Sequence, residues 1–438
     1  MDAKIIAEEI FLAGVESVMP AQMTGRNIFK SKGRIFLGNK ELDVGKFEHV
    51  YVIGAGKASA KMALEIESVL GDKISSGHVV VKYGHGCKLQ YIDVSEAGHP
   101  VPDANGYAAT KKILELAKQA TENDLVICLI SGGGSSLLTD LPADSSMEEL
   151  ITLNELLLRS GADIQEINAV RKHLSKVKGG QLAQSAFPAT VVTLILSDVI
   201  GDPLHSIASG PTVPDPTTFA DAIAVLNKYD LHSKVSPILT AYLRMGINGL
   251  IPETPKPGDP VFTRSHNFII GSNKIALEAC KKKASDYGLN SFIITSQLDG
   301  DLAGAAKEIV DKAIVYQNNS SVKKPCCLLF GGETTVKVTG SGVGGRNQHF
   351  ALYASILLKD QTGITLLSAG TDGNDGPTPA AGAVVDTNTY PDAIYKGLKV
   401  EEYLQNFDSY HFFEKAGGHI ITGPTMTNVM DLIVVIIE

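Results

Sequence analysis

A chain of 438 residues, with 44% hydrophobic and 20% charged residues, has the composition of a globular protein and the length of two or three domains. Its formal net charge of −9 argues against the basic stripe of a nucleic-acid-binding surface, so no nucleic-acid partner is expected. The same charge means that any phosphate site must be local, built from a few placed cations, backbone N–H groups and a metal ion.

The N-terminal stretch, residues 1–19, carries acids and a helical period instead of an uncharged apolar run. No segment approaches the about 20 apolar residues of a membrane span, so no membrane partner is expected. The five cysteines form no CxxC pair, and Cys128, Cys326 and Cys327 lie in apolar runs, as buried reduced thiols do. These features predict a cytoplasmic protein and leave the oligomeric state open, a homo-oligomer included.

Short apolar runs that lead into a glycine-rich or polar end alternate along the chain with stretches of helical periodicity. The runs are residues 50–56, 125–134, 193–201, 268–273, 328–333 and 365–373. The helical patterns are residues 57–70, 106–120, 147–158, 165–178, 274–283, 302–316 and 346–358. Unbroken apolar runs are typical of strands buried on both faces, so we predict an α/β fold with parallel sheets. Ligands in such sheets gather beyond the carboxyl ends of the strands, where these glycines lie.

The chain is expected to divide into two domains. Residues 251–259 contain three prolines in a short polar stretch and are the best candidate for a linker. We therefore predict an N-terminal domain of residues 1–250 and a C-terminal domain of residues 260–438.

The first glycine-rich strand end is Gly54–Ser59, with the sequence GAGKAS. It lacks the P-loop pattern, and Lys82 follows the next strand where a dinucleotide-binding fold carries an acid for the ribose. What remains is a lysine at a helix N-terminus, where free N–H groups and the helix dipole favour an anion. We interpret Lys57 as an anion contact, and a surface lysine is the alternative.

A second loop follows the apolar strand of residues 125–130 and consists of Ser131, Gly132, Gly133, Gly134, Ser135 and Ser136. Three consecutive glycines let backbone N–H groups surround phosphate oxygens, and the flanking hydroxyls add donors. A flexible surface turn is the alternative, but it does not need a strand that runs directly into it. This loop, the glycine loop below, is predicted to hold phosphate.

Two charged residues complete the predicted site. Asp198 ends a strongly apolar strand, so it should lie at the same rim and either take a hydroxyl proton or hold Mg²⁺. A helix N-cap is the alternative role for this aspartate. Arg346 follows two glycines and opens an amphipathic helix, a position from which a guanidinium can grip a carboxylate or phosphate bidentately.

Other charged groups leave their role open. Asp372 and Asp375 lie in a glycine-rich turn and either bind a cation or only shape the turn. A basic group lies on the predicted helix of residues 165–178, and it either lines a cleft through Arg171 and Lys178 or only complements the helix dipole. Its members are Arg171, Lys172, Lys176 and Lys178. His99 and His173 have no second ligand at a suitable spacing, so no zinc site is expected.

Together these segments resemble the glycerate 2-kinase family, whose C-terminal part is called MOFRL. The resemblance covers the chain from about residue 5 to near the C-terminus and rests on eight segments in the family order. They are VIGAGKAS (52–59), SEAGHPVPDANG (95–106), LISGGGSSLL (129–138), NAVRKHLSKVKGG (168–180), SDVIGDPLHSIASGPTVPDP (197–216), GGETTV (331–336), GGRNQ (344–348) and SAGTDGNDGPT (368–378).

The resemblance implies a Rossmann-like N-terminal domain and a smaller C-terminal α/β domain that face a cleft. It implies Mg²⁺-dependent transfer of phosphate from ATP to the 2-hydroxyl of the small-molecule substrate D-glycerate, which gives 2-phosphoglycerate. The lysine, aspartate and arginine of the family's cleft fall on Lys57, Asp198 and Arg346, with Lys57 and Arg346 as substrate contacts and Asp198 as the candidate metal ligand. Ile200-Gly201 stands where some relatives carry an extra acid, which leaves the metal arrangement open.

Two other functions remain to be separated from this one. An NAD(P)H-dependent hydroxypyruvate reductase would act on a similar small acid, and the missing ribose acid after the second strand speaks against it. A non-catalytic nucleotide-binding protein would bind ATP without releasing ADP in the presence of glycerate.

Overall fold

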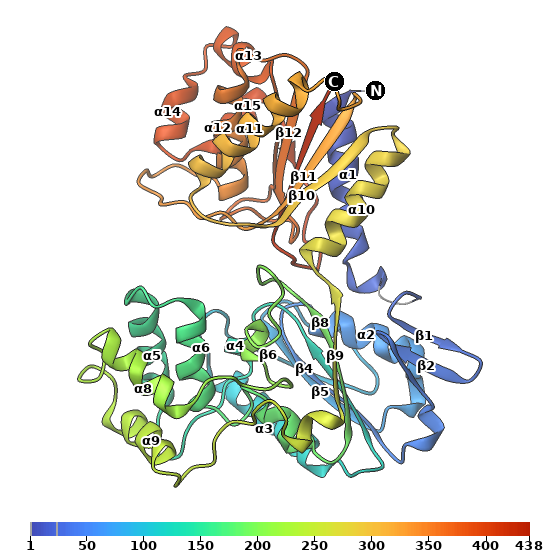
Figure 1. The fold of residues 1–438 in the computed structure, drawn as a ribbon, viewed down its shortest axis with the longest axis vertical. Helices are drawn as coiled ribbons and strands as arrows, with labels where there is room; N and C mark the ends of the chain where they lie inside the picture. Colours follow the sequence, from blue (N-terminus) through green and yellow to red (C-terminus); the bar gives the residue numbers. More distant parts are fainter. Residues whose placement is uncertain (1, 23–24) are drawn as a thin grey trace. The chain divides into compact units, whose positions relative to one another are not determined.

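Three β-sheets organise the computed structural model within the residues that it describes, 2–22 and 25–438. The chain forms two compact units. The large unit holds Pro20–Ser197 and Asp202–Ile270, and the small unit holds Met1–Met19, Asp198–Gly201 and Gly271–Glu438. Each unit has one six-stranded sheet, and the large unit also has an antiparallel ribbon of three strands (Figure 1). The ribbon strands are β1 (Ile28–Ser31), β2 (Arg34–Leu37) and β3 (Lys40–Leu42).

The six-stranded sheet of the large unit has the strand order β6-β5-β4-β7-β8-β9. Its strands are β4 (Val50–Ala55), β5 (Ser76–Lys82), β6 (Asp93–Ala97), β7 (Leu125–Ile130), β8 (Thr190–Leu196) and β9 (Ser265–Gly271). Neighbours from β6 to β8 run parallel, which confirms the predicted Rossmann-like sheet. The strand order reverses between β4 and β7, and the crevice beyond their carboxyl ends is where ligands bind in sheets of this type.

Helices cover both faces of this sheet. Helix α2 (Ser59–Leu70) packs on one face through Met62 and Ile66, and α3 (Ala104–Gln119) packs against β4, β5 and β6. Helix α3 begins where the carboxylate of Asp103 accepts a hydrogen bond from Gly106 N at 2.9 Å. Because the sheet is covered twice, every residue of β4, β7 and β8 is buried, which explains their unbroken apolar sequences.

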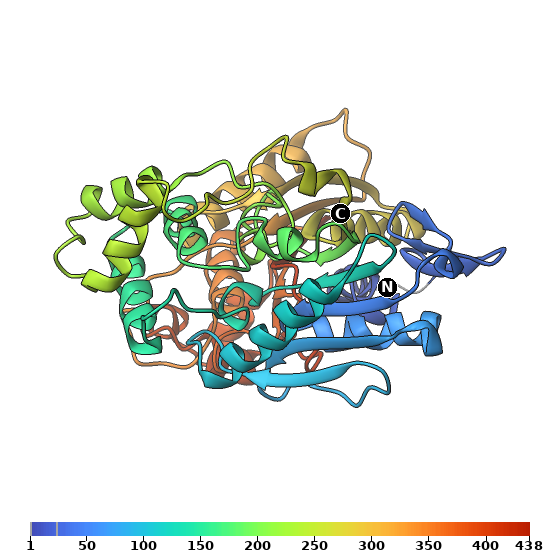
Figure 2. The same ribbon diagram turned by 90° about the horizontal axis from the view of Figure 1, so that it is seen from below.

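A separate group of helices forms one end of the large unit, away from the β1–β3 ribbon (Figure 2). The group consists of α5 (Met147–Arg159), α6 (Ile164–His173), α8 (Phe219–Lys228) and α9 (Pro237–Ile247). Helices α5, α6 and α8 each begin with a reciprocal capping box, such as that between Ser146 and Glu149. Their apolar faces meet in one cluster that includes Leu153 and Leu157. Two short helices, α4 (Gly134–Leu137) and α7 (Gln181–Ala186), complete the unit.

The sheet of the small unit is mixed, with the order β10-β11-β15-β12-β13-β14. Strands β10 and β11 run parallel, and the other neighbouring pairs run antiparallel. The expectation of parallel strands was therefore wrong for most of this sheet, because burial on both faces, not strand direction, makes a strand continuously apolar. The strands are β10 (Asn290–Leu298), β11 (Cys326–Gly332), β12 (Ile364–Gly370), β13 (Gly382–Asp386), β14 (His419–Ile420) and β15 (Asp431–Ile437).

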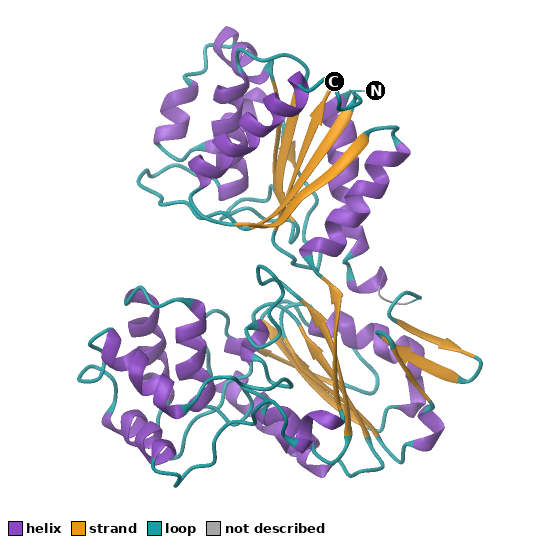
Figure 3. Ribbon diagram, in the orientation of Figure 1, coloured by secondary structure: helices purple, strands orange, loops and turns teal. Residues whose placement is uncertain are grey.

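Two layers of helices sandwich this mixed sheet (Figure 3). One layer is α1 (Ala3–Ser17) and α10 (Asn273–Asp286), and the other contains α11 (Leu302–Asn318), α12 (Arg346–Leu358), α13 (Thr389–Tyr395), α14 (Val400–Gln405) and α15 (Ser409–Ala416). Side chains alternate between the layers, so Ile433 and Val435 of β15 join one cluster whereas Val434 and Ile436 join the other. In the described residues no helix is long and apolar enough to cross a membrane.

The division into units differs from the expected division at residues 250–260 in three respects, the first of which is that Asp198–Gly201 belongs to the small unit. Helix α1 belongs to the small unit, because Ile10, Phe11 and Val15 pack among apolar residues of α10 and the sheet. The proline-rich residues 251–259 are part of the large unit and are packed there. Thr254 is 3% exposed, and its hydroxyl donates to Asp215 Oδ2 at 3.0 Å.

Candidate active site

The glycine-rich ends of β4 and β7 are joined by hydrogen bonds at the reversal point of the large-unit sheet. Lys57 N donates to Gly132 O at 2.9 Å, and Ala58 N donates to Ser131 Oγ at 3.0 Å. Gly56 has a φ of +136°, and a Cβ at this position would lie 2.2 Å from Ser131 Oγ. Only glycine fits such a position. The close approach and the hydrogen bonds show that the two loops, which were predicted separately, form one structure.

The glycine loop keeps two donors free of other protein groups. Within the described residues, no protein acceptor is bonded to the backbone N–H groups of Gly132 and Gly133. Its hydroxyls are engaged: Ser135 Oγ lies 2.8 Å from Ser209 Oγ, and Ser136 Oγ donates to Gly133 O at 3.1 Å. The backbone can therefore serve an anion, as predicted, while two hydroxyls hold the loop in shape.

Lys57 lies half-buried beside this loop and forms no ion pair with a described residue. The region around it is basic. Burial, together with the positive charges of Lys57 and Lys82, lowers the pKa of His99 to about 4. Because its pKa is lowered, His99 is neutral at pH 7. It packs directly on the loop, since a Cβ on Gly133 would lie 2.7 Å from its ring. The arrangement favours an anionic ligand over a cation.

Arg346 opens α12 in the small unit, and two carboxylates hold its guanidinium. Its Nε and Nη2 donate to the two oxygens of Asp431 at 2.6 and 2.9 Å, and its Nη1 lies 2.6 Å from Glu333 Oε1. Burial disfavours the charged form, but the hydrogen bonds that Arg346 donates to Asp431 and the charges of Asp431, Glu333 and Asp375 outweigh it and raise the pKa of Arg346. This arginine is a fixed positive charge.

The acids around Arg346 form one electrostatic group. Burial raises the pKa of Glu333, and the negative charges of Asp431, Asp198 and Asp372 raise it further, against the opposing charge of Arg346. The structure thus brings the predicted residues Asp198 and Arg346 to one carboxylate, that of Glu333. Lys57 belongs to the large unit.

The two aspartates whose roles were open differ in the structure. Asp375 is buried and shapes the start of α12, where its carboxylate accepts from the backbone N–H groups of Asn347 at 3.0 Å and Gln348 at 2.8 Å. Burial, despite these hydrogen bonds and with a contribution from Asp431, raises the pKa of Asp375 to about 6. Asp372 instead lines a cavity of about 620 Å³ with Arg346, and its Oδ1 accepts a hydrogen bond from Asn374 N at 3.1 Å.

Sequence reasoning missed Glu333 as a charged partner, although it quoted the segment that contains it, and missed Asp431 altogether. Asp431 begins β15 and is paired in register with Gly332 of β11 and Gly370 of β12. The only signal was an acid at the head of the last apolar run, DLIVVII. Its contact with Arg346 depends on the antiparallel pairing of β15, which no local pattern announces.

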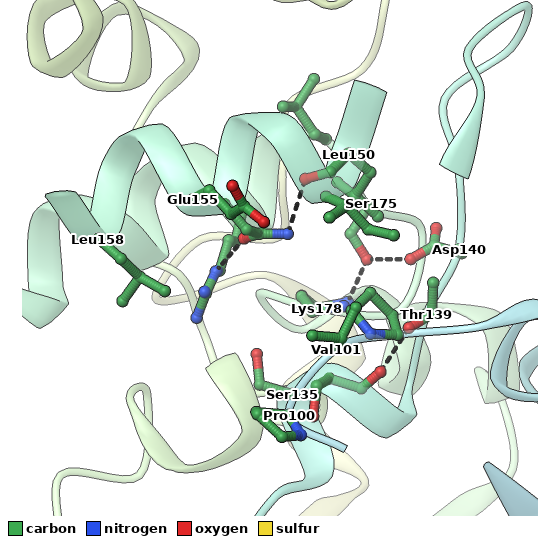
Figure 4. A pocket seen from close by; sticks show the side chains of 16 residues that line it. Pro100, Val101, Ser135, Thr139, Asp140, Leu150, Glu155, Leu158, Ser175 and Lys178 are labelled. Carbon is green, nitrogen blue, oxygen red and sulfur yellow. Dashed lines mark hydrogen bonds between the residues drawn. The ribbon is translucent and has the colours of Figure 1, made fainter. Parts of the chain in front are cut away.

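A second cavity, of about 160 Å³, lies in the large unit beside the glycine loop (Figure 4). Arg171 and Lys178 both line it, as one of the two open readings expected. The predicted helical face that would connect them was wrong, because α6 ends at His173 and Lys178 lies in the following turn. Lys172 points elsewhere and forms a buried ion pair with Asp215, with Nζ and Oδ1 3.1 Å apart.

The described residues contain one cluster of side chains with the spacing of metal ligands. The one group of three or more His, Cys, Asp or Glu side chains with ligand atoms within 4.8 Å of each other is Glu48, His49 and Asp124. It lies where β4 and β7 begin, at the opposite edge from the glycine-rich loops, and Asp124 there accepts hydrogen bonds from Thr121 and His49. This group therefore shapes the strand entry.

Comparison with known proteins identifies the family. Residues 6–244 match a family model described as a domain of unknown function, and residues 326–431 match the MOFRL family. A D-glycerate 2-kinase from Thermotoga maritima is 42% identical over 435 residues, which are 98% of this chain and 97% of that protein. The chain belongs to the glycerate 2-kinase family.

The similarity extends to the whole fold. A crystal structure of a glycerate kinase from Thermotoga maritima superposes with a TM-score of 0.87 at 41% identity, and it covers 99% of both chains. Another relative, from Agrobacterium vitis, carries the provisional name hydroxypyruvate reductase and is 41% identical over 88% of this chain and 86% of its own. The resemblance read from the eight sequence segments is therefore confirmed.

Proposed function

We propose that the protein transfers the terminal phosphoryl group of ATP to the 2-hydroxyl of D-glycerate and releases 2-phosphoglycerate and ADP. The observation that carries this proposal is the identity of 42% to a D-glycerate 2-kinase over 98% of the chain. The hydroxyl oxygen forms a new bond to the phosphorus, the bond from that phosphorus to the ADP oxygen breaks, and the hydroxyl proton leaves.

Residues of the large unit are proposed to hold the donor. The free N–H groups of Gly132 and Gly133 suit phosphate oxygens, and Lys57, which has no acidic partner among the described residues, adds a positive charge beside them. Phosphoryl transfer depends on positioning and charge neutralisation more than on covalent help. This loop and Lys57 supply both.

Residues of the small unit are proposed to act on the acceptor. Asp198 orients the attacking hydroxyl and takes its proton, and Arg346 faces the glycerate carboxylate or the transferring group. The ion pairs of Arg346 with Asp431 and Glu333 fix the direction of its guanidinium before substrate arrives. A fixed cation needs no reorganisation during the reaction, which is the property that makes such groups effective.

Mg²⁺ is the metal that we propose for this reaction. Carboxylate oxygens are its preferred protein ligands, and Asp198 and Asp372 are acids whose charges act on Glu333 beside Arg346. We assign the ion to these two residues. When held by these carboxylates, Mg²⁺ would supply positive charge that offsets the negative charge of the phosphates.

A coupled assay tests the proposal. The enzyme receives D-glycerate, ATP and Mg²⁺, and enolase is added without a phosphoglycerate mutase. Because enolase acts only on 2-phosphoglycerate, we expect phosphoenolpyruvate to accumulate with ADP. ADP without phosphoenolpyruvate would mean transfer to a different hydroxyl, and absence of ADP would refute the kinase proposal.

The reductase is the second candidate because one relative carries that name. In the structure β5 ends at Lys82, so an acid to hold a nicotinamide ribose is missing from the position where such folds place it. The same preparation is mixed with hydroxypyruvate and NADH or NADPH. We expect no change of absorbance at 340 nm, and a steady decrease would favour the reductase. The cytoplasmic location and the oligomeric state stay predictions.

A further inference from the structure

The cavity beside the glycine loop, called here the Arg171 cavity, has walls from three segments of the large unit. They are the loop after β6 with Val101, helix α5 with Ile151, and the turn after α6 with Leu174 and Lys178. The floor includes Ser135 of the glycine loop (Figure 4). Val101 is 55% exposed and Leu158 64% exposed at its rim, so large apolar side chains stand open to solvent there.

The half-buried Arg171 in this cavity forms no ion pair with an acid among the described residues. Arg171 Nε donates to the neutral amide oxygen of Asn154 at 2.7 Å, and among the described residues no carboxylate forms an ion pair with this arginine. Burial alone lowers the pKa of Arg171. A guanidinium removed from water needs a partner, because its desolvation is otherwise uncompensated. The missing partner is an anion that arrives with the ligand.

Lys178 is a second cation in the lining of the Arg171 cavity. It is 7% exposed, its Nζ donates to Leu138 O at 2.5 Å, and burial lowers its pKa to about 8 against the attraction of Asp140. Asp140 is already engaged, because its oxygens accept from Ser175 Oγ and Lys176 N at 2.5 Å each. Two cations and two acids therefore line the cavity, and the second acid, Glu155, lies 3.7 Å from Arg159 Nη2, so neither acid forms an ion pair with Arg171 among the described residues.

The rest of the lining combines aliphatic side chains with several hydroxyl, amide and carboxylate groups, and the cavity is small. A volume of about 160 Å³ is below the about 300–1,000 Å³ of pockets that enclose whole drug-sized ligands, so it suits one ring system. The hydroxyls of a small hydroxy acid would lose their hydrogen bonds to water against Leu150, Ile151 and Leu174, whereas a flat heteroaromatic ring can turn its apolar faces to these side chains and its polar edge to the polar ones.

We propose that the Arg171 cavity binds the nucleoside end of the phosphoryl donor. The base lies between Ile151 and Val101, Arg171 and Lys178 face the phosphate next to the ribose, and the other phosphates continue past Ser135 along the glycine loop. This inference rests on the proposed kinase function, since it takes a nucleotide as the donor. It adds a binding site for the base, made by residues that are remote from Lys57 in the chain.

Titration calorimetry with ADP and with tripolyphosphate, which lacks the base, tests the site. Ile151→Trp fills the cavity and should weaken ADP binding about 10-fold or more while tripolyphosphate binding is unchanged. Arg171→Gln should weaken ADP binding about 10- to 100-fold, the range for one charge-assisted hydrogen bond. Thr152→Trp on the exposed side of α5 and Arg159→Gln at its end are the matched controls, and both should bind ADP within about 2-fold of wild type.

A third variant guards against misfolding of the first two. Val101→Asp lies on an exposed part of the loop and introduces a carboxylate at the mouth, so it should fold normally and weaken ADP binding. Wild-type ADP affinity in all three folded variants would overturn the inference, and so would a loss of D-glycerate binding with ADP affinity retained. Calorimetry needs no turnover, so it is independent of the enolase assay. If the variants change ADP binding as expected but the wild-type protein makes no 2-phosphoglycerate, the nucleotide site is supported and the kinase function is refuted.

Discussion

Replacement of Arg346 by alanine should reduce both stability and turnover, and the structure separates the two effects. The variant loses the hydrogen bonds to Asp431 and the ion pair to Glu333. Breaking a fully buried ion pair costs about 3–5 kcal/mol. The side chain of Arg346 is 33% exposed and that of Asp431 6% exposed, so solvent screening reduces the expected loss of unfolding free energy to about 2–3 kcal/mol.

The stability that Arg346→Ala loses should increase with pH. Burial already raises the pKa of Glu333, and removal of Arg346 takes away the charge that lowers it. A carboxyl whose pKa is raised in the folded state destabilises the protein above that pKa and ceases to do so below its ordinary value. The stability difference between Arg346→Ala and wild type should therefore be larger at about pH 8 than at about pH 4.

Urea unfolding followed by circular dichroism measures the stability, and ADP release at saturating ATP and D-glycerate measures turnover. We expect turnover to fall about 10³-fold or more, by analogy with arginines that face a transferring phosphoryl group. Arg34→Ala breaks an exposed ion pair with Glu41 and is the control, with an expected loss below about 1 kcal/mol and normal turnover. Near-normal turnover of Arg346→Ala would refute its role in the reaction. A stability loss no larger than that of the control would refute the ion-pair argument.

Three other outcomes are expected. Lys57→Ala should lower kcat/KM for ATP about 100-fold or more without a change in the urea midpoint, and equal kinetics would remove this lysine from the site. Gly56→Ala places a Cβ 2.2 Å from Ser131 Oγ and should inactivate the enzyme and lower its melting temperature, whereas Gly71→Ala, with φ +57° and nothing within 4 Å, should cost about 1–3 kcal/mol and leave turnover normal. Asp375, with its pKa raised to about 6, should make the protein about 2–3 kcal/mol less stable as pH rises from about 4 to about 7. Asp375→Asn should flatten that part of the pH–stability curve, and an unchanged slope would show that the carboxyl is not strained by burial.

Local pattern located the strands and their functional ends well, for a physical reason. A strand buried on both faces must be apolar throughout, and the chain must turn sharply where it leaves the sheet, so the sequence marks both events. The predicted helix of residues 346–358 has the observed bounds, and residues 57–70 differ from α2 by two residues at one end. The strand ends that carry Lys57 and the glycine loop were found in this way.

The local sequence pattern did not predict contacts between segments that are distant in the chain. Helix α1 shows an ordinary amphipathic period that does not name its partner, which is α10, more than 250 residues away. The basic run after Arg171 continues the helical pattern to residue 178, yet the chain leaves the helix at His173, because the side chains of Ser175 and Asp140 bind the turn. Such tertiary contacts override a propensity of only a few tenths of a kcal/mol per residue, about 0–0.7 kcal/mol.

A protein with a negative net charge can bind anionic substrates if some of its cations are not paired with acids. In the small unit the cation Arg346 is held by Asp431 and Glu333, so that part of the protein offers a fixed charge within an acidic surround suited to a metal ion. In the large unit Lys57 and Arg171 have no acidic partner among the described residues, so they are available to an incoming anion. A chain of net charge −9 can thus bind a nucleotide because a few unpaired cations, not the overall charge, set the local potential. Adding one more carboxylate to the Arg171 cavity through Val101→Asp should therefore weaken ADP binding while changing the net charge by only one unit.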